Sequence, residues 1–462
     1  MKQFEFIDLD LLKKYDRPGP RYTSYPTAPL FSSDFGADQY LQEILDTNTK
    51  ESKRDLSLYF HFPFCDTLCY FCGCTMLVTS KRDRISEYNV YLKKEIERVA
   101  AHIAKHRKVV QLHWGGGTPS YLEPDEIRDV GGAIQSHFSF AEDIEAGVEI
   151  DPRGLTFDHM KAFQESGFNR CSMGVQDFDE RVQKAVNRVQ PESITRDAVN
   201  WARQLGFKSL NLDLIYGLPF QSVPSFEKTL DTIIDISPDR VAVFNYAHVP
   251  WLKKHQKLIK PEDLPSLEEK LRLHKLALEK LGEAGYWNIG MDHFAKTDDE
   301  LAVAQRNKTL YRNFQGYSTK KGCDLYGFGM SAIGHTENTY QQNVKTLTEY
   351  YASINENRLP THAGYRMTTD DHIRKETILR LMCDLEIEKA MIERQFDIRF
   401  DEYFADSLLQ LKTFEEDGLL ELKPDRIVVK NLGRLVIRNM AMCFDAYLEK
   451  MMKEKPVFSR TV

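Results

Sequence analysis

The sequence predicts an α/β protein, because from residue 56 onward short apolar runs alternate with longer amphipathic stretches. Three predicted helix ends carry a glycine followed by an aromatic residue: Gly167-Phe168, Gly206-Phe207 and Gly285-Tyr286. Glycine adopts the left-handed conformation of a helix C-cap at little cost, and the aromatic residue can then pack back. This repeated βα pattern predicts an open (β/α)6 partial barrel related to the TIM barrel.

The predicted strands cover residues 56–62, 109–114, 147–151, 170–175, 209–215, 240–246 and 287–291. Polar residues cluster near the carboxyl ends of several of these strands: Glu149, Asp151, Gln176, Asp213, Asn245 and Tyr246. Any one of them is equally well explained as a turn residue or a helix N-cap. Because active sites of (β/α) barrels lie at the carboxyl ends of the strands, the repetition favours a ligand-lined edge.

We expect three parts in the chain. Residues 1–55 form an N-terminal strap, or a solvated arm, with a stiff proline-rich segment. Residues 56–365 form the catalytic barrel with an extension, and residues 366–462 form a small, mostly helical, winged-helix-like domain. That last part should contain helices near 367–385, 400–418 and 432–450 and a hairpin at 419–429. Its acidic residues leave no basic face for DNA, so a covering or docking role is favoured.

The composition is that of an ordinary globular enzyme. The 462 residues are 42% hydrophobic and 28% charged, and a net charge of −7 gives no general attraction to nucleic acid. No apolar run is long enough to span a bilayer, and the N-terminus lacks the apolar core of a signal peptide. Eight cysteines in a chain of this size do not make a disulfide scaffold. The sequence therefore predicts a cytoplasmic protein.

Three cysteines, Cys65, Cys69 and Cys72, have the spacing Cys-x3-Cys-x2-Cys inside an aromatic run. This spacing suits a tight loop around an iron–sulfur cluster, but it supplies three thiolates where a fully protein-ligated [4Fe–4S] cluster uses four. One iron would stay open to another ligand, as the open position of a catalytic zinc does. A structural zinc knuckle is the alternative. Zinc sites usually pair two ligand dyads, and the chain has no second Cys-x2-Cys pair.

A glycine-rich loop, Gly115-Gly116-Gly117, follows a predicted strand directly. Glycines let the backbone approach a ligand closely and offer N–H groups to it. The lysine of a phosphate-binding loop is missing, and a plain tight turn is the alternative. A second glycine-rich segment at 327–334 is a structural turn or a cofactor contact, with neither favoured.

These features together resemble the radical S-adenosylmethionine (SAM) enzymes and, nearly end to end, the family of oxygen-independent coproporphyrinogen III oxidases. The segments that carry the resemblance are 20–27, 69–74, 111–119, 172–178, 213–219, 243–248, 313–317 and 437–445. The resemblance implies anaerobic oxidative decarboxylation of the ring A and B propionates of coproporphyrinogen III to vinyl groups, giving protoporphyrinogen IX. A 5′-deoxyadenosyl radical, generated from SAM at a [4Fe–4S] cluster, would carry out the reaction.

The resemblance also implies the site residues. The cluster ligands would be Cys65, Cys69 and Cys72, and the catalytic residues Cys74 and Tyr59. Two SAM molecules per chain are implied. The first would contact Tyr59, Gly116, Glu149 and Ile333, and the second Phe71, Gly117, Thr118, Gln176, Arg188, Asp213 and Ala247. A tetracarboxylate substrate also needs cationic anchors, for which Arg21, Arg188 and His293 are candidates.

Further expectations concern partners and alternatives. The protein should be a monomer that uses an electron donor and an electron acceptor, with no nucleic acid and no membrane span. Haem chaperones, a sister family with the same cysteine loop, bind and deliver haem instead. A regulatory interaction protein and a radical SAM enzyme for another tetrapyrrole also stay open. Cys74, the proline-rich strap and the Gln176, Arg188 and Asp213 set favour the oxidase.

Overall fold

The computed structural model describes residues 3–4, 7–454 and 458–461. The chain forms two compact units. The first combines Met1–Pro29, Leu214–Lys321 and Met367–Val462, and the second combines Leu30–Asp213 and Gly322–Arg366. Residues 1–2 and 5–6 of the predicted strap, and 455–457 and 462 of the predicted C-terminal domain, lie outside the described residues. The three-part division at 55/56 and 365/366 stays a prediction.

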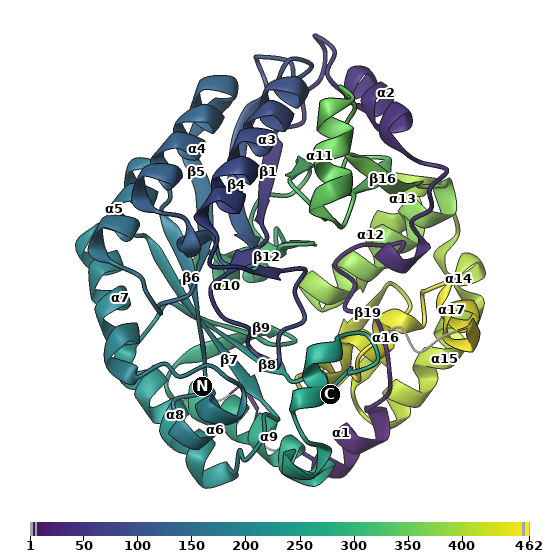
Figure 1. Cartoon of the computed structure of the whole chain (residues 1–462). Coiled ribbons are helices and arrows are strands. Elements are labelled where there is room, and N and C mark those ends of the chain that lie inside the picture. The colour runs from purple at the N-terminus through teal and green to yellow at the C-terminus, as the bar shows by residue number, and fades with distance from the viewer. Residues whose placement is uncertain (1–2, 5–6, 455–457, 462) are drawn as a thin grey trace. The chain divides into compact units, whose positions relative to one another are not determined.

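The second unit is built on a sheet with the strand order β16-β15-β14-β13-β1-β4-β5-β6-β7. The strands β13, β1, β4, β5 and β6 are parallel neighbours. Their bounds are β1 Leu56–Phe62, β4 Lys108–Gly116, β5 Ser139–Ile150, β6 Arg170–Gln176, β7 Ser209–Tyr216 and β13 Asp324–Phe328. The helices α3 (Arg82–Ala100), α4 (Pro124–His137), α5 (Phe157–Glu165) and α7 (Glu192–Gln204) connect successive strands and cover the outer side of this sheet (Figure 1).

The predicted βα order is confirmed. The pairs β1-α3, β4-α4, β5-α5 and β6-α7 lie in the second unit, and the boundary between the units falls within β7, after Asp213. The order continues in the first unit with α8 (Val223–Ile236), β8 (Arg240–Asn245) and α9 (Leu267–Glu283). The strand at 56–62 has the predicted bounds, whereas β5 begins eight residues before the predicted 147. The additional residues of β5 are half-buried or exposed, so they carry no apolar signal in the sequence.

Apolar side chains from the helices and strands of the second unit fill its core. The ring of Trp114 on β4 is fully buried, and its centroid lies 4.6 Å from that of Phe62 and 5.0 Å from that of Phe168. Phe168 follows Gly167, whose φ of +90° is the left-handed cap expected from the sequence. Gly206 and Gly285 have φ of +77° and +89°, so all three predicted caps are confirmed.

An antiparallel extension of the second unit's sheet was not predicted. After β13, the strands β14 (Ile333–His335), β15 (Thr339–Asn343) and β16 (Thr361–Arg366) pair antiparallel, and α11 (Leu347–Asn355) precedes β16. The glycine-rich segment 327–334 is therefore a strand, a turn and the start of the next strand. These strands bury polar side chains such as Gln341 and Asn343, so they lack the apolar alternation that marks a strand. The unit also contains α2 (Ala37–Thr47), β2 (Phe64–Cys65), β3 (Leu77–Val78) and α6 (Glu180–Ala185).

In the first unit, the strand predicted at 287–291 is present as β9 (Tyr286–Gly290), but the next strand, β10 (His293–Lys296), pairs antiparallel with both β9 and β8. Two residues join β9 to β10, which is too short for a parallel crossover and forces a hairpin. The other α-helices and strands described in this unit before residue 322 are α1 Leu9–Tyr15, α10 Glu300–Arg306, β11 Tyr311–Asn313 and β12 Gly316–Ser318, and two short 3-10 helices lie at Lys254–Leu258 and Pro261–Asp263.

The C-terminal part of the first unit is mostly helical, as predicted. It contains α12 Thr369–Asp384, β17 Glu386–Glu388, α13 Lys389–Phe396, α14 Phe400–Tyr403, α15 Ala405–Glu416, β18 Leu420–Leu422, β19 Arg426–Val429, α16 Ile437–Met442 and α17 Leu448–Glu454. The predicted single helix at 432–450 is wrong. Asp445 interrupts it, because its Oδ1 accepts hydrogen bonds from the backbone N–H groups of Tyr447 and Leu448 and so caps α17.

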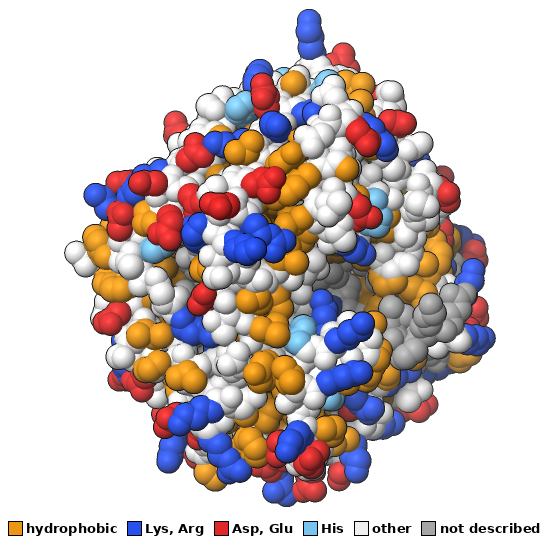
Figure 2. Space-filling view, in the orientation of Figure 1, with side chains coloured by type: hydrophobic (Ala, Val, Ile, Leu, Met, Phe, Trp, Pro, Cys, Tyr) orange, Lys and Arg blue, Asp and Glu red, His pale blue; other side chains and the backbone are white. Residues whose placement is uncertain are grey.

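The distribution of charge on the surface and the character of the helices match what the composition predicts. On the face drawn in Figure 2, basic and acidic side chains are interspersed among apolar ones. No helix in the described part of the chain combines the length and the apolar character needed to cross a membrane.

Candidate active site

A cavity of about 780 Å³, including its open mouth, lies in the second unit at the carboxyl ends of β4, β5, β6 and β7. This is the edge at which (β/α) barrels place their active sites. Its lining includes twelve of the predicted site residues: Cys65, Cys69, Phe71, Cys72, Cys74, Gly116, Gly117, Thr118, Glu149, Gln176, Arg188 and Asp213. Residues separated by almost 150 positions in the sequence thus share one cavity.

The loop that carries the cysteines is held at both sides. At its base, β2 and β3 pair parallel, and the N–H of Leu77 donates to the carbonyl of Pro63 at 2.7 Å. On the other side, the Asn187 side chain donates to the carbonyl of Leu68 at 2.8 Å. The loop therefore presents its sulfur atoms from a fixed backbone.

No group of three or more His, Cys, Asp or Glu residues in the described ranges converges on a position for a single metal ion. A [4Fe–4S] cluster does not require such convergence, because each thiolate binds a different iron. The donor set fits the cluster: Cys65, Cys69 and Cys72 line one cavity, and none of the eight cysteines forms a disulfide.

The glycine loop at the end of β4 leaves no room for side chains. A Cβ on Gly116 would lie 2.6 Å from the imidazole of His61, and one on Gly117 would lie 2.6 Å from the backbone of Pro63. The N–H of Gly116 donates to Oε2 of Glu149 at 3.1 Å. Loss of solvent contact opposes ionisation of Glu149, but His113 and this N–H hold the pKa of its carboxyl below the ordinary value. Glu149 is thus a carboxylate that faces the cavity at neutral pH.

Asp151 and Arg188 form an ion pair beside the cysteines, with Arg188 Nη1 2.9 Å from Oδ2 of Asp151. Burial opposes ionisation of Asp151, yet the charges of Arg188 and Arg153 hold the pKa of its carboxyl below the ordinary value. In the described part of the chain, Nε of Arg188 and Oε1 of Gln176 are buried without a hydrogen-bond partner. Gln176 also has a φ of +70°, a strained conformation that is common at ligand sites.

Asp213 differs from the other two acids. Burial raises the pKa of its carboxyl to about 6, although Ser172 and Asn211 donate hydrogen bonds to it at 3.0 and 2.7 Å. Neutral donors compensate a buried charge less than a guanidinium does. Asp213 therefore changes its protonation state in a range where the other two acids stay ionised.

The predicted residues Tyr59 and Ile333 are not among the residues that line the cavity. The Tyr59 hydroxyl lies 3.1 Å from Nδ1 of His61, and its ring stacks on His113 with 6.0 Å between the ring centroids. Burial raises the pKa of Tyr59 well above its ordinary value, so it stays protonated. Two residues before Ile333, the Ser331 hydroxyl lies 3.4 Å from Nε2 of His61.

The other predicted residues, Ala247, Arg21 and His293, belong to the first unit. Ala247 follows β8. His293 is no cation at neutral pH, because burial and the charges of Arg312 and Arg21 lower the pKa of its imidazole to about 3. Arg21 donates to Asp292, and partial burial together with the charges of Arg438 and Arg312 lowers the pKa of its guanidinium to about 9.

Arg21, Arg312 and Arg438 form a group that we call the arginine cluster. Arg438 donates to the carbonyl of Pro20, and Arg312 donates to the carbonyl of Arg21 at 3.3 Å. No carboxylate in the described part of the chain pairs with Arg312 or Arg438, and Nη1 of Arg312 is buried without a hydrogen-bond partner there. The cluster therefore holds more positive charge than Asp292 neutralises.

Sequence reasoning missed several residues of the region. Arg153, Ser172 and His61 were not singled out, although Arg153 lies only two residues after the polar strand end at Asp151. Arg312 also escaped notice. Arg153 and His61 each have one partner two residues away, Asp151 and Tyr59. Their contacts with Cys69 and Ser331, and that of Arg312 with Arg21, join distant segments, which no local spacing indicates.

Comparisons with known proteins agree with this geometry. Residues 59–233 match the family model described as the radical SAM superfamily, and residues 367–436 match the HemN C-terminal domain. The oxygen-independent coproporphyrinogen III oxidase of Escherichia coli (strain K12) is 46% identical over 455 residues, which cover 98% of both chains. The enzyme of the same name from Pseudomonas aeruginosa is 44% identical over 98% of both chains.

A solved structure described as coproporphyrinogen III oxidase (HemN) from Escherichia coli, a radical SAM enzyme, matches with a TM-score of 0.91. The two chains are 45% identical, and the match covers 96% of this chain and 99% of the other. This chain belongs to the oxygen-independent coproporphyrinogen III oxidases of the radical SAM superfamily.

Proposed function

We propose that this protein catalyses the anaerobic oxidative decarboxylation of coproporphyrinogen III in haem biosynthesis. The propionates of rings A and B become vinyl groups, and the product is protoporphyrinogen IX. The observation that carries the proposal is the cavity in which Cys65, Cys69 and Cys72 meet the glycine loop and Glu149, within a chain 46% identical to such an oxidase over nearly its whole length.

Radical SAM enzymes use a [4Fe–4S] cluster and SAM, and the donor set of the cavity fits them. Cys65, Cys69 and Cys72 would hold three irons, which leaves the fourth for the amino and carboxylate groups of SAM. When bound, the cluster and SAM supply the one-electron chemistry that removes hydrogen from an unactivated propionate carbon, which no side-chain base can deprotonate near neutral pH.

The first SAM would be oriented by Tyr59, Gly116, Glu149 and Ile333. Glu149 is ionised, so it can accept hydrogen bonds from the N–H groups of the SAM amino group. A side chain at Gly116 is excluded, because its Cβ would lie 2.6 Å from the imidazole of His61, so the loop keeps a bare backbone that a ligand can approach.

A second SAM is the finer part of the proposal, with Phe71, Gly117, Thr118, Gln176, Arg188, Asp213 and Ala247 as its contacts. The unpartnered Nε of Arg188 and Oε1 of Gln176 support it, because both are buried polar atoms that a ligand would satisfy. Arg188 already pairs with Asp151, so we assign it to this SAM and not to the substrate. The role of Ala247 rests on the resemblance alone.

The arginine cluster is our candidate for the substrate carboxylates. Guanidinium groups bind carboxylates through paired, charge-assisted hydrogen bonds, and Arg312 has a buried N–H group available. Arg21 remains a candidate anchor beside it. His293 is uncharged, so it would act only through hydrogen bonds.

Cys74 and Tyr59 are proposed as catalytic residues. The thiol of Cys74 is exposed in the cavity, and the backbone N–H of the same residue donates to Sγ of Cys72 at 3.4 Å. Tyr59 keeps its proton and can donate a hydrogen bond. We also propose a cytoplasmic monomer that needs no nucleic acid and works with an electron donor and an acceptor that the chain does not identify.

The test is an anaerobic assay of reconstituted protein with SAM, a reductant, an electron-accepting extract and coproporphyrinogen III. Protoporphyrin and 5′-deoxyadenosine are measured together. We expect both products, with two deoxyadenosines for each protoporphyrin if each propionate needs one SAM. Deoxyadenosine without protoporphyrin would contradict the proposed substrate. Neither product, with haem retained on the protein, would indicate the haem chaperones instead.

A further inference from the structure

Two of the predicted cluster ligands accept hydrogen bonds from neutral donors. The Thr118 hydroxyl donates to Sγ of Cys65 at 3.2 Å, and the backbone N–H of Cys74 donates to Sγ of Cys72 at 3.4 Å. Neutral donors stabilise a thiolate moderately, because they supply a dipole and no net charge.

The third ligand has charged donors. Nη2 of Arg153 lies 3.4 Å from Sγ of Cys69, and Nη1 of Arg188 lies 3.6 Å from the same sulfur. Since a charge-assisted hydrogen bond is about twice as strong as a neutral one, the environment of the three sulfurs is strongly asymmetric.

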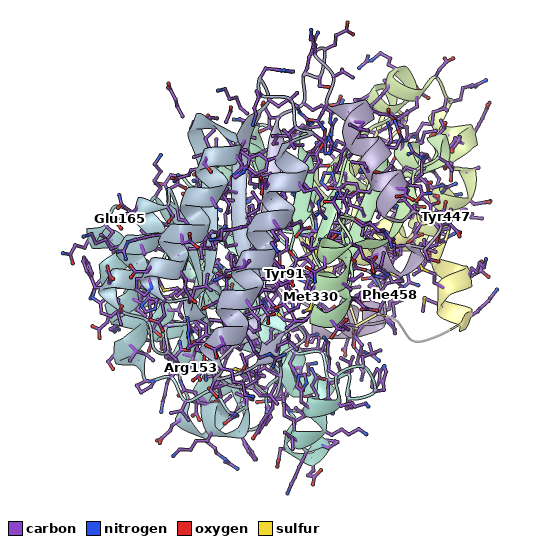
Figure 3. The ribbon with its side chains drawn as sticks, turned by 45° about the horizontal axis from the view of Figure 1, so that its top comes forward. Tyr91, Arg153, Glu165, Met330, Tyr447 and Phe458 are labelled. Carbon is purple, nitrogen blue, oxygen red and sulfur yellow. The ribbon has the colours of Figure 1, made fainter. Side chains whose placement is uncertain are left out.

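Asp151 holds Arg153 in this position. Nε of Arg153 lies 3.1 Å from Oδ1 of Asp151, and Nη2 lies 2.7 Å from Oδ2. Nη2 has two hydrogens, so it can serve the carboxylate and the sulfur together. The Arg153 side chain is 21% exposed. Arg153 lies in the loop between β5 and α5, and Figure 3 labels it together with Glu165, the last residue of α5.

The charges at this point do not cancel. Two guanidiniums, of Arg153 and Arg188, share one carboxylate, Asp151, so one positive charge is left beside Cys69. Reduction of an iron–sulfur cluster adds negative charge that spreads over its sulfur ligands. Hydrogen bonds and positive charge at those ligands therefore stabilise the reduced form and raise the reduction potential.

We propose that Arg153 is a positioning residue that acts through Cys69 and raises the reduction potential of the bound cluster. The proposal rests on the proposed function only in that the three cysteines bind the cluster. It places Arg153 among the groups that decide how easily an electron donor of the cell reduces this enzyme.

The test is a potentiometric titration of the reconstituted cluster, followed by electron paramagnetic resonance without SAM and without substrate. We expect Arg153→Gln to keep the iron content and to shift the midpoint potential to a more negative value. Arg153→Lys keeps the charge but not the planar fork, and its shift should be smaller. Arg128→Gln is the control: it removes an arginine that pairs with Asp158 and Glu165 and does not line the cavity, so its potential should equal that of the wild type.

An unchanged potential in Arg153→Gln with full iron content would overturn the proposal. If Arg153→Gln binds no cluster, the midpoint potential of Arg153→Lys is the test instead. An unchanged potential in Arg153→Lys would also overturn the proposal. Loss of the cluster in both variants would assign Arg153 a purely structural role. Because the titration contains no coproporphyrinogen, a shifted potential in a protein that makes no protoporphyrin would contradict the proposed function and leave this inference intact.

Discussion

The cavity of the second unit combines acids with guanidiniums, whereas the arginine cluster of the first unit is predominantly cationic. In the cavity, Asp151 lies between two guanidiniums, and Glu149 accepts hydrogen bonds from the backbone and from His113. In the arginine cluster, three guanidiniums face one paired carboxylate, Asp292. Because an unneutralised buried charge is costly, it persists where a ligand supplies the counter-charge. This contrast supports our proposals that the cavity orients cofactors and that the arginine cluster receives an anion.

The largest effect is expected in the cavity, from loss of one of the predicted cluster ligands. Cys69→Ala removes one thiolate of three, so the cluster should not assemble and turnover should be lost. Iron content and electron paramagnetic resonance after reconstitution measure the outcome. Cys171→Ala is the control, since Cys171 is buried on β6 and does not line the cavity. Full iron content and activity in Cys69→Ala would refute the ligand assignment.

Cys74→Ser should separate cluster assembly from catalysis. Serine keeps the backbone N–H that donates to Cys72, so the iron content should stay normal. The thiol in the cavity is replaced by a poorer proton and hydrogen donor, and we expect protoporphyrin formation to fall about tenfold or more. Normal turnover with normal iron content would remove Cys74 from the mechanism.

Arg312→Gln tests the arginine cluster. Loss of a charged hydrogen bond to a substrate carboxylate should raise KM for coproporphyrinogen about tenfold or more. Cleavage of SAM without substrate should not change, because the cavity residues are intact. The control is Arg434→Gln, which removes a buried arginine whose guanidinium bonds Asn288 and Gln305. Equal KM changes in both variants would attribute the effect to the fold.

Gly117→Ala tests how closely the cavity is packed. The new Cβ would lie 2.6 Å from the carbonyl group of Pro63, so the cysteine loop must shift, and we expect a loss of about 1–3 kcal/mol in the free energy of unfolding. Gly132→Ala in α4 is the control, because its Cβ meets nothing within 4 Å and alanine favours a helix. Thermal or denaturant unfolding of the cluster-free proteins gives the difference. Equal stability of Gly117→Ala and the wild type would show that the loop adjusts freely.

The smallest effect concerns Asp213, whose side-chain hydrogen-bond donors, Ser172 and Asn211, are both uncharged. Its folded pKa of about 6 lies above the ordinary 3.8, so the folded state binds more protons and stability falls as pH rises from about 4 to about 6. Asp213→Asn removes this penalty. We expect the cluster-free variant to unfold at a higher temperature than the wild type at pH 7.5, and the advantage to disappear near pH 4. An advantage that does not vary with pH would contradict the shifted pKa.

Several features could be predicted because their cause is local. The three helix caps depend on a glycine at one position, and the strand at 56–62 shows its apolar pattern in seven residues. The cysteine spacing likewise indicates a cluster loop within eight residues. Where the cause is not local, prediction failed. The strands β14–β16 depend on pairing partners along the sheet. The interruption of the last helix is different, because Asp445 caps α17 from two and three residues away, and this local signal was overlooked.

The βα order, the cysteine loop, the glycine loop and the family to which they point can all be recognised in the amino-acid sequence. Which charges meet depends on the fold, and no pattern in the sequence reveals it. Arg153 approaches Cys69 across 84 positions of the chain, and Arg312 approaches the backbone of Arg21 across 291. A local pattern reports the conformation of its own segment, whereas the electrostatic environment of a site depends on segments that only folding brings together.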